Sequence, residues 1–510
     1  MMKIHIDGQV ISLADLRAAW QSPTSVTIGK SAAQRITASN AHIASVLAGG
    51  EQVYGVNTGF GQLAQVRVSD DELVHLQKNL VRSHAVGVGE DLPDSCVRLI
   101  MILKLIALAR GCSGVRPALV ERLCDLINKE IYPCIPSKGS VGASGDLAPL
   151  AHMACVLIGE GAASVNGAIV PALEALETAG LEPLSLAPKE GLALLNGTQV
   201  STALALSAVF RTENIFAAAL TAGALSTDAI KGSDTPFDER IQFARGHAGQ
   251  IDVAKVLRRL MKGSEIRASH IDCGRVQDPY SIRCQPQVAG ACLDVLRHVC
   301  TVLEIEANAV TDNPLVFADS KAVLSGGNFH AEPVALAADY LALAIAEIGS
   351  LSERRIALLI DSHLSGLPAF LVKESGLNSG FMMAQVTAAA LASENKSLAH
   401  PACVDNIPTS ANQEDHVSMA MFAAMRLQTM LDNVAHIVAI ELLAAAQGVE
   451  FHRPKHSSGV LESVISDIRE ISPAYTEDRS MSDEFAELAA IINQGSFYSL
   501  AESILPSAKA

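Results

Sequence analysis

The segment of this sequence best equipped to do chemistry is a run of small residues from Gly139 to Asp146. It reads Gly-Ser-Val-Gly-Ala-Ser-Gly-Asp, a composition that suits a phosphate-binding loop or the nucleophile turn of a hydrolase. The spacing G-x-x-x-x-G-K-[ST] is missing and no G-x-G-x-x-G occurs, which excludes a phosphate loop. The hydrolase turn is excluded because its last glycine is replaced by Asp146, and because a chain of helices lacks the sheet that strains such a turn.

A third interpretation is internal cyclisation of Ala143-Ser144-Gly145. The Gly145 nitrogen carries no neighbouring side chain, so it can attack the Ala143 carbonyl carbon. Loss of that oxygen as water, and of the Ser144 hydroxyl as a second water, leaves a five-membered ring with an exocyclic methylene, which is a strong electrophile. The alternative for these three residues is an ordinary Gly/Ser loop leading into a helix that is capped near Asp146.

The elements that must position this segment are predicted to be helices. Ala and Leu abound and only 4% of residues are aromatic, so we expect a core of small side chains that lets helices approach closely. Apolar residues recur at helical spacing over 97–110, 117–130, 192–210, 285–308, 333–360, 381–396 and 418–447. We therefore predict a mainly α fold with a central bundle of long helices, and a homo-oligomer because several helices are apolar on nearly every face.

Strands are expected only at the periphery. Residues 3–12 alternate apolar and polar side chains around Asp7-Gly8, which predicts a small β-hairpin, and Ser12 with Asp15 predicts the start of a helix. A second hairpin is predicted around Asn166-Gly167.

Gly- and Asn-rich interruptions separate the helices, and such polar loops are where sites tend to lie. They fall at 54–61, 139–146, 196–198, 277–287, 325–332 and 412–416. No linker or repeat marks a clean domain boundary. We expect residues 1–195 to carry the reactive loops and residues 196–510 to form the long-helix bundle, within one continuous structural unit.

Charge and composition exclude several classes of protein. The net charge of -16 argues against nucleic acid or an anionic membrane surface as the main partner. The N-terminus lacks a basic segment followed by an apolar one, and charged residues interrupt the most apolar stretches, so we expect neither secretion nor a membrane span. The ten cysteines contain no C-x-x-C pair, so we expect no metal site and a reducing cytoplasm.

The extended string from Gly139 to Leu150 closely resembles the signature of the aromatic amino acid ammonia-lyases. The resemblance continues in Val53-Tyr-Gly-Val-Asn-Thr-Gly-Phe-Gly61, Leu194-Leu-Asn-Gly-Thr198, residues 277–287, Asp312-Asn-Pro314, residues 325–330 and Asn412-Gln-Glu-Asp-His416, and it is weakest beyond about Leu431. It implies a 4-methylidene-imidazol-5-one group formed autocatalytically from Ala143-Ser144-Gly145, with no external cofactor. It also implies a homotetramer whose active sites draw loops from several subunits.

The resemblance assigns two parts of the elimination of ammonia to particular residues. The ring activates the substrate amine by forming a covalent bond to it, because an α-amino group is a poor leaving group. Tyr54, with Tyr280 as a second phenol, is the implied base, and a phenol must have its pKa lowered before it can abstract a proton near neutral pH. Arg283 is implied to bind the substrate carboxylate with its guanidinium fork.

Further residues are implied to line the pocket. Asn196 and Gln277 offer amide donors for developing negative charge, and Phe329 is expected to wall the site. Without the resemblance, each of these residues has an ordinary structural interpretation, such as loop hydrogen bonding or core packing.

The substrate is implied to be L-histidine, with urocanate as the product. Ser83-His84 stands where the phenylalanine and tyrosine enzymes of the family carry Phe-Leu or His-Leu, so His84 places a polar ring against the substrate side chain. Glu414 follows the pattern of the histidine-specific members, and its carboxylate could hydrogen-bond the imidazole or transfer a proton. Met382 could line the same wall.

Three alternatives stay open at this point. The chain could act on phenylalanine or tyrosine, or it could be a 2,3-aminomutase that uses the same electrophile and returns the amine to the β-carbon. A helical lyase of the fumarase and argininosuccinate type is disfavoured because its G-S-S-x-M-P-x-K-x-N loop is absent. An all-helical scaffold is disfavoured because no repeat period is visible.

Overall fold

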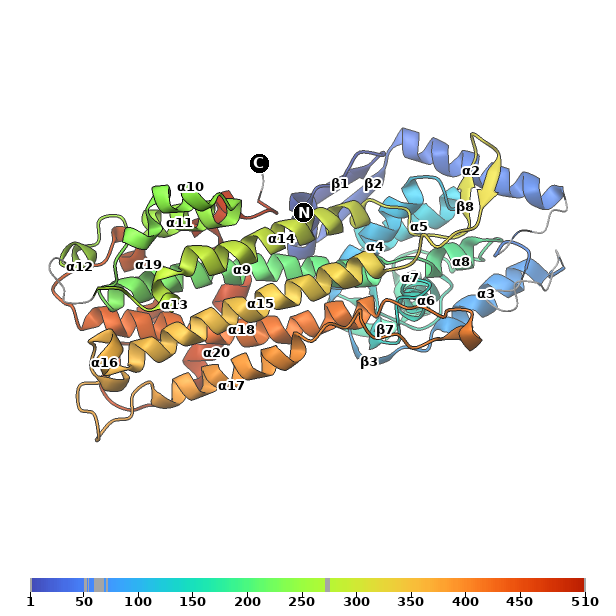
Figure 1. Ribbon diagram of the computed structural model, residues 1–510. Coiled ribbons are helices and arrows are strands. Elements are labelled where there is room, and N and C mark those ends of the chain that lie inside the picture. The colour runs from blue at the N-terminus through green and yellow to red at the C-terminus, as the bar shows by residue number, and fades with distance from the viewer. Residues whose placement is uncertain are drawn as a thin grey trace. The chain divides into compact units, whose positions relative to one another are not determined.

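The structure is a computed structural model that describes residues 2–49, 53, 55–58, 68–69, 72–270 and 276–508 (Figure 1). The described chain is mainly helical with a few short strands, which confirms the predicted fold class. The chain divides into two compact units, each made of three segments. Unit 1 consists of Met1–Ser207, Cys300–Asp339 and Pro401–Met425, and unit 2 consists of Ala208–Val299, Tyr340–His400 and Arg426–Ala510. These boundaries differ from the division at residue 195 suggested by the sequence, because distant segments return to each unit.

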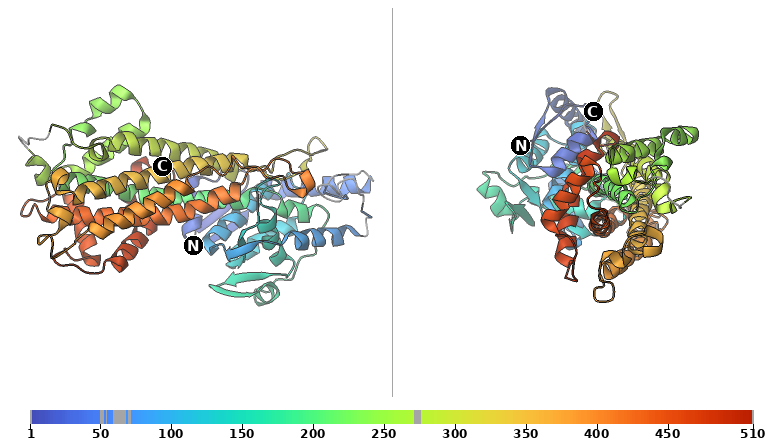
Figure 2. Two further views of the ribbon diagram at one scale, coloured as in Figure 1. Left: turned by 60° about the horizontal axis from the view of Figure 1, so that its bottom comes forward. Right: turned by 90° about the vertical axis from the view of Figure 1, so that its left-hand side faces the viewer.

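Four of the five unit boundaries fall inside long helices, α9 (Gln199–Ala229), α14 (Gln285–Ala307), α15 (Glu332–Ile360) and α18 (Ala420–Glu450), and the fifth lies in the loop between His400 and Pro401. Within unit 2 their segments run side by side in all the ribbon views (Figures 1 and 2). Alanines such as Ala217, Ala218 and Ala222 of α9 are fully buried, as expected for a core of small side chains. The helix expected over 192–210 is divided at the polar loop 196–198, because α8 (Glu190–Leu195) ends there and α9 begins after it.

Unit 1 combines shorter helices with small sheets. Its further elements are β1 (Met2–Ile6), α1 (Leu13–Gln21), β2 (Thr24–Ile28), α2 (Lys30–Ala48), α3 (Leu73–His84), β3 (Val88–Asp91), α4 (Asp94–Ala109), α5 (Pro117–Asn128), β4 (Ile131–Pro133), β5 (Pro136–Lys138), α6 (Leu147–Leu157), β6 (Ala162–Val165), β7 (Ala168–Pro171), α7 (Ala172–Thr178), β8 (Leu315–Phe317), β9 (Ala322–Leu324) and the short 3-10 turn η5 (Ser410–Asn412). The sheets pair β1 with β2, β3 with β5, β4 with β6 and β7, and β8 with β9.

One of the two predicted hairpins forms and the other does not. Strands β6 and β7 pair antiparallel around Asn166-Gly167, which confirms that prediction. The hairpin predicted around Asp7-Gly8 is wrong, since β1 pairs with β2 in parallel after the chain has passed through α1. Asp7 caps a helix instead of forming a hairpin turn, because its Oδ1 accepts a hydrogen bond from the Ala32 backbone in the first turn of α2 at 2.8 Å. The predicted helix start is confirmed, with Ser12 accepting from the Asp15 backbone.

Unit 2 surrounds its bundle with shorter helices. These are η3 (Thr235–Phe237), α10 (Glu239–Arg245), α11 (Ala248–Met261), α12 (Glu265–Ala268), α13 (Tyr280–Arg283), α16 (Ser362–Ser365), η4 (Ala369–Leu371), α17 (Met382–Leu398), α19 (Gly459–Ile471), α20 (Ser482–Gln494), η6 (Tyr498–Leu500) and η7 (Glu502–Ile504). A buried ion pair crosses the bundle, where Arg355 donates to both carboxylate oxygens of Glu441 at 2.5 and 2.8 Å.

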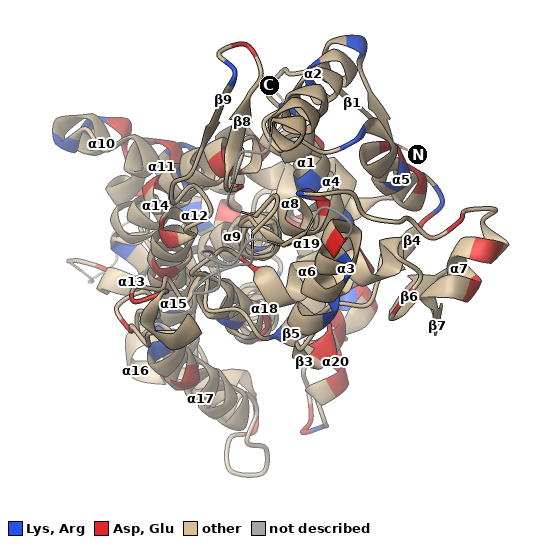
Figure 3. Cartoon of the chain, turned by 90° about the vertical axis from the view of Figure 1, so that its right-hand side faces the viewer, with Lys and Arg blue, Asp and Glu red and all other residues tan. Residues whose placement is uncertain are grey.

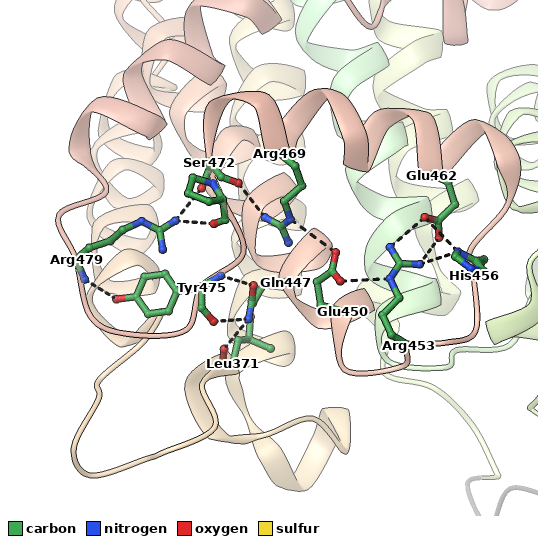
Figure 4. Close-up of polar contacts among 11 residues, drawn as sticks. Leu371, Gln447, Glu450, Arg453, His456, Glu462, Arg469, Ser472, Tyr475 and Arg479 are labelled. Atoms are coloured by element: carbon green, nitrogen blue, oxygen red, sulfur yellow. Dashed lines mark hydrogen bonds and ion pairs between the residues drawn. The ribbon is translucent and has the colours of Figure 1, made fainter.

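Polar contacts fasten the end of α18 to the segment that follows it (Figure 4). Arg453 donates to both carboxylate oxygens of Glu462 at 2.9 and 3.0 Å and to Glu450 at 3.2 Å. Gln447 exchanges two hydrogen bonds with the Tyr475 backbone, each at 2.9 Å. This region of unit 2 is therefore held by side-chain contacts as well as by apolar packing.

Three helices, α9, α15 and α18, are long and apolar enough to cross a membrane by length and composition alone. However, 94%, 61% and 83% of their most apolar windows are buried inside the protein, so these helices form core. Lys and Arg residues are interspersed with acidic residues over the elements in view instead of gathering on one of them (Figure 3).

Candidate active site

A cavity of about 1130 Å³ in unit 1 collects six of the residues singled out in the sequence. Those residues are His84, Ala143, Ser144, Asn196, Phe329 and Glu414. The helices α3, α6 and α8 pack against one another and supply three parts of the lining. His84 ends α3, the Ala-Ser-Gly segment directly precedes α6, and Asn196 follows the last residue of α8.

The Ala-Ser-Gly segment is held against the loop that follows α8. Gly145 forms an isolated parallel bridge with Gly197, and the next backbone nitrogen, that of Asp146, donates to the Gly197 carbonyl at 2.8 Å. Gly145 has φ +74°, and a Cβ there would lie 2.2 Å from the Gly197 carbonyl oxygen. Only glycine fits this close approach. On the other side, Ser418 Oγ donates to the Gly142 carbonyl at 3.0 Å.

The Asp146 carboxylate also holds this segment in place. Its Oδ2 accepts from the backbone and the hydroxyl of Ser201 at 2.7 and 2.9 Å, and its Oδ1 accepts from the Ser140 hydroxyl at 3.0 Å. Burial raises the pKa of the Asp146 carboxyl, and these hydrogen bonds oppose that shift. The carboxylate therefore fixes both ends of the loop around Ser144.

Glu414 contacts the serine of the Ala-Ser-Gly segment directly. Ser144 Oγ donates to Glu414 Oε1 at 2.6 Å, and Thr409 Oγ1 donates to Glu414 Oε2 at 2.7 Å. Thr409 and Glu414 also exchange backbone hydrogen bonds at 2.9 and 3.3 Å. Between them Ser410, Ala411 and Asn412 all have left-handed φ values of 52°, 52° and 66°. Such conformations cost about 1 kcal/mol or more each and persist where the surroundings impose them, so the fold constrains the backbone that presents Glu414.

His84 presents one ring nitrogen to the protein. Its Nδ1 lies 2.9 Å from the Leu80 carbonyl oxygen and 3.1 Å from Ser83 Oγ. A carbonyl can only accept, so Nδ1 carries the proton and Nε2 is the acceptor of the neutral ring. The half-buried His84 ring is therefore suited to receive a hydrogen bond in the cavity.

Asn196 is fixed through both its side chain and its backbone. Its Nδ2 donates to the Asn313 carbonyl at 2.9 Å, and its own carbonyl accepts from Lys104 Nζ at 2.6 Å. Lys104 also donates to the Ala193 carbonyl at 3.1 Å, so one buried ammonium binds the carboxyl end of α8. Burial lowers the pKa of Lys104 to about 7, with Asp312 acting in the opposite direction.

A second buried lysine lies in the same region. Lys189 Nζ forms an ion pair with Asp312 Oδ2 at 2.7 Å, and both side chains are buried. Burial lowers the pKa of Lys189, and the Asp312 carboxylate raises it. Sequence reasoning missed both lysines. The available signal for Lys104 was a single charge within the apolar run 99–109 of α4, which indicates a buried and satisfied group.

Four of the predicted site residues belong to unit 2. Gln277 and Arg283 line a separate cavity of about 440 Å³. Tyr280 begins α13 and is 69% exposed, with the Arg283 guanidinium carbon 4.4 Å from its ring centroid. Within the described part of the chain, the buried Arg283 Nε has no hydrogen-bond partner. Met382 begins α17 and is 38% exposed.

Tyr54 lies outside the described residues, so its predicted role stays a prediction. The cavity of unit 1 has further polar lining that sequence reasoning did not single out: Asn79, Asn313, Gln413, Asp415, His330 and His416. The rings of His330 and His416 stack with centroids 5.8 Å apart. All but Asn79 lie in sequence strings that resemble the family. Their position in these strings was the signal by which they could have been predicted. Among the described residues, no group of three or more His, Cys, Asp or Glu side chains could hold a metal ion.

Residues 11–470 match the family described as aromatic amino acid lyase, which is nine-tenths of the chain. The chain belongs to this family and is a carbon–nitrogen lyase. The motif resemblance is thus confirmed at the level of the family.

Individual relatives cover almost the whole chain. A histidine ammonia-lyase of Paracidovorax citrulli is 57% identical over 497 residues, which span 98% of this chain and 97% of the relative. The crystal structure of histidine ammonia-lyase from Trypanosoma cruzi is similar with a TM-score of 0.91 at 41% identity, covering 99% of this chain and 96% of that one. A tyrosine aminomutase from Streptomyces globisporus is similar with a TM-score of 0.93 at 36% identity, covering 98% of both chains.

Proposed function

We propose that this chain eliminates ammonia from L-histidine to give trans-urocanate, the first step of histidine degradation. The observation that carries the proposal is the contact between Ser144 and Glu414 at 2.6 Å, in a cavity that His84 and Asn196 also line. A carboxylate and an imidazole thus share one cavity with the serine of a potential electrophile. The names of the relatives that match almost the whole chain support histidine as the substrate.

The local structure fits a 4-methylidene-imidazol-5-one ring formed from Ala143, Ser144 and Gly145. Gly145 supplies a nitrogen with no side chain beside it, at a position where the Gly197 backbone leaves no room for a Cβ. Asp146 and Ser418 hold the segment on either side of the three residues. When formed, the ring supplies an electrophile that bonds the substrate amine.

The side chains around the ring would bind the substrate, stabilise charge and abstract a proton. His84 and Glu414 would hydrogen-bond the substrate imidazole, and a phenyl ring would leave both groups unsatisfied at a cost of roughly 1 to 3 kcal/mol per group. Asn196 would hold developing negative charge through its amide, and Phe329 would limit the volume of the pocket. Glu414 is also a candidate base, beside the phenols Tyr54 and Tyr280.

We further propose a homotetramer with shared active sites, to which Gln277, Tyr280, Arg283 and Met382 belong. In this arrangement Arg283 would bind the substrate carboxylate as a bidentate pair. Exposed apolar side chains on α17, Met383 at 63% and Val386 at 47% exposure, support burial of that helix face against another copy.

We place the enzyme in the cytoplasm and expect no external cofactor, because the electrophile would be made from the chain itself. A 2,3-aminomutase is the second candidate, and the similarity to the tyrosine aminomutase structure favours it specifically. The two functions differ in whether an acrylate is released or a β-amino acid accumulates.

The variant Ser144→Ala tests the proposal. We expect it to keep the helical circular dichroism of the wild type, to lack the loss of two water molecules in its intact mass, and to lose nearly all turnover of L-histidine. Ser320→Ala, at an exposed serine outside the cavity, is the matched control and should behave as the wild type. A fully active Ser144→Ala enzyme would contradict the proposal that a ring formed from Ser144 is the electrophile.

A further inference from the structure

The short helix α8 is tied at both of its ends to the dipeptide Asp312-Asn313. At its start, Lys189 Nζ donates to Asp312 Oδ2 at 2.7 Å. At its end, Asn196 Nδ2 donates to the Asn313 carbonyl oxygen at 2.9 Å. All four residues are buried, so water does not compete for these contacts. The dipeptide therefore cannot shift without disturbing a contact at one end of the helix.

The Asp312 carboxylate couples the two ties. While its Oδ2 accepts from Lys189, its Oδ1 accepts from the Asn313 backbone nitrogen at 2.7 Å. The Asn313 side-chain oxygen in turn accepts from the Gly326 backbone at 2.7 Å. The ion pair thus helps to fix the backbone of Asn313, the residue whose carbonyl receives Asn196.

The Asn313 carbonyl selects the orientation of the Asn196 amide. A turn of 180° about the last side-chain bond would exchange the N–H donors of a primary amide with its oxygen acceptor at almost unchanged shape. A carbonyl only accepts, so the Asn196 amino group must face Asn313. Among the described residues the amide makes this one hydrogen bond, so its second N–H is left for a group in the cavity that Asn196 lines. The Asn196 backbone is fixed separately, because its carbonyl accepts from Lys104 Nζ at 2.6 Å.

We propose that Lys189 is a positioning residue for the elimination of ammonia, which acts through the Asp312-Asn313 dipeptide on the amide of Asn196. Without the ion pair the Asn313 carbonyl can shift, and the amide can then present its oxygen instead of an N–H to developing negative charge. That charge is absent from the bound substrate, so the defect appears in kcat with little change in KM. This inference rests on the proposed function, which gives Asn196 the role of holding developing charge.

The test is a double-mutant cycle measured as kcat for L-histidine. Asn196→Ala should lower kcat about 100-fold or more, because it removes the donor itself. Lys189→Met should lower kcat about tenfold or more and change KM less than about twofold. In Asn196→Ala/Lys189→Met the second substitution should cost nothing further, since no amide is left to position.

Two controls separate positioning from a general loss of stability. Arg116→Met breaks the ion pair to the buried Glu190, the residue next to Lys189, and leaves the contact with Asp312. It should unfold at lower urea concentration than the wild type yet keep its kcat. Lys189→Met/Asp312→Asn leaves no unpaired buried charge, so it should regain the resistance to urea that Lys189→Met loses but not the kcat. This charge-balanced pair of substitutions replaces Lys189→Met in the cycle if the latter does not fold.

Intact mass completes the test, because every variant should be as many waters lighter than its sequence as the wild type. A variant that retains those waters would overturn the inference, since the ion pair would then act on ring formation. A further drop in kcat when Lys189→Met is added to Asn196→Ala would also overturn it, as would an equal loss of kcat in Arg116→Met. Recovery of kcat together with stability in Lys189→Met/Asp312→Asn would do the same. A wild type without turnover of L-histidine would instead contradict the proposed function.

Discussion

Lys104→Met removes the buried ammonium that binds the end of α8 and keeps most of the side-chain volume. Lys104 is 2% exposed and donates to the carbonyls of Ala193 and Asn196, at the end of α8. Each lost hydrogen bond costs about 1 kcal/mol, and a buried carbonyl left without a donor adds about as much again. The substitution also removes a charge whose burial is costly, so the two effects have opposite signs and only one of them depends on pH.

The sign of the pH effect follows from the pKa of Lys104. Burial lowers it from an ordinary value of 10.5 to about 7. Between these values the unfolded chain holds the proton and the folded chain does not, so unfolding takes up a proton. The free energy of unfolding of the wild type therefore rises with pH through this window, by at most about 1.4 kcal/mol per pH unit from this group. Below about pH 7 both states hold the proton, and the destabilisation by the buried charge is complete.

Urea unfolding followed by circular dichroism at fixed protein concentration measures this difference from pH 6 to pH 10. We expect Lys104→Met to be less stable than the wild type by a few kcal/mol at pH 10, with the difference shrinking or reversing towards pH 6. Lys129→Met, at an exposed lysine beyond the end of α5, is the control and should follow the wild type at every pH. Parallel pH curves for Lys104→Met and the wild type would refute the reasoning.

Three further predictions concern specificity, the reactive loop and the bundle. His84→Leu should raise kcat/KM for L-phenylalanine relative to L-histidine by about tenfold or more in steady-state kinetics, because it removes a polar group that a phenyl ring leaves unsatisfied; an unchanged ratio would remove His84 from the substrate contact. Gly197→Ala places a Cβ within 2.8 Å of a neighbouring backbone oxygen at φ +128°, so intact mass should show that the two waters are retained. Gly180→Ala, with φ +68° and no atom within 4 Å, is its control and should lose both waters. Arg355→Met leaves the Glu441 carboxylate buried without its partner, so the free energy of unfolding should fall by about 3 to 5 kcal/mol, and adding Glu441→Gln should restore part of that loss.

The helices and the nature of the site were accessible from the sequence for identifiable reasons. Helical apolar spacing places most of the long helices within a few residues, because burial of a continuous face leaves a periodic pattern. The exception is α9, which continues to Ala229, well past the end predicted at 210. The hairpin predicted at Asp7 failed because the same residue that favours a turn also caps a helix, and only the folded chain brings the first turn of α2 to that carboxylate.

Local sequence patterns could not predict which distant residues come together in the site. Nothing in the neighbourhood of Ser144 indicates that Glu414, 270 positions later, will accept its hydroxyl proton. Lys104 was overlooked because the apolar pattern around it predicts a buried helix but does not predict that the carbonyls of Ala193 and Asn196 will accept its hydrogen bonds. The resemblance to a family supplied Arg283 as a residue type, but its place in a unit separate from Ser144 follows only from the three-dimensional structure.

The most direct test of the central claim is the near-ultraviolet absorbance of the purified wild type mixed separately with L-histidine, L-phenylalanine and L-tyrosine. Loss of ammonia from each would release a conjugated acrylate that absorbs in this region. We predict a steady rise with L-histidine alone. A rise with the aryl amino acids would contradict the roles given to His84 and Glu414, and no rise with any of the three would contradict the elimination itself.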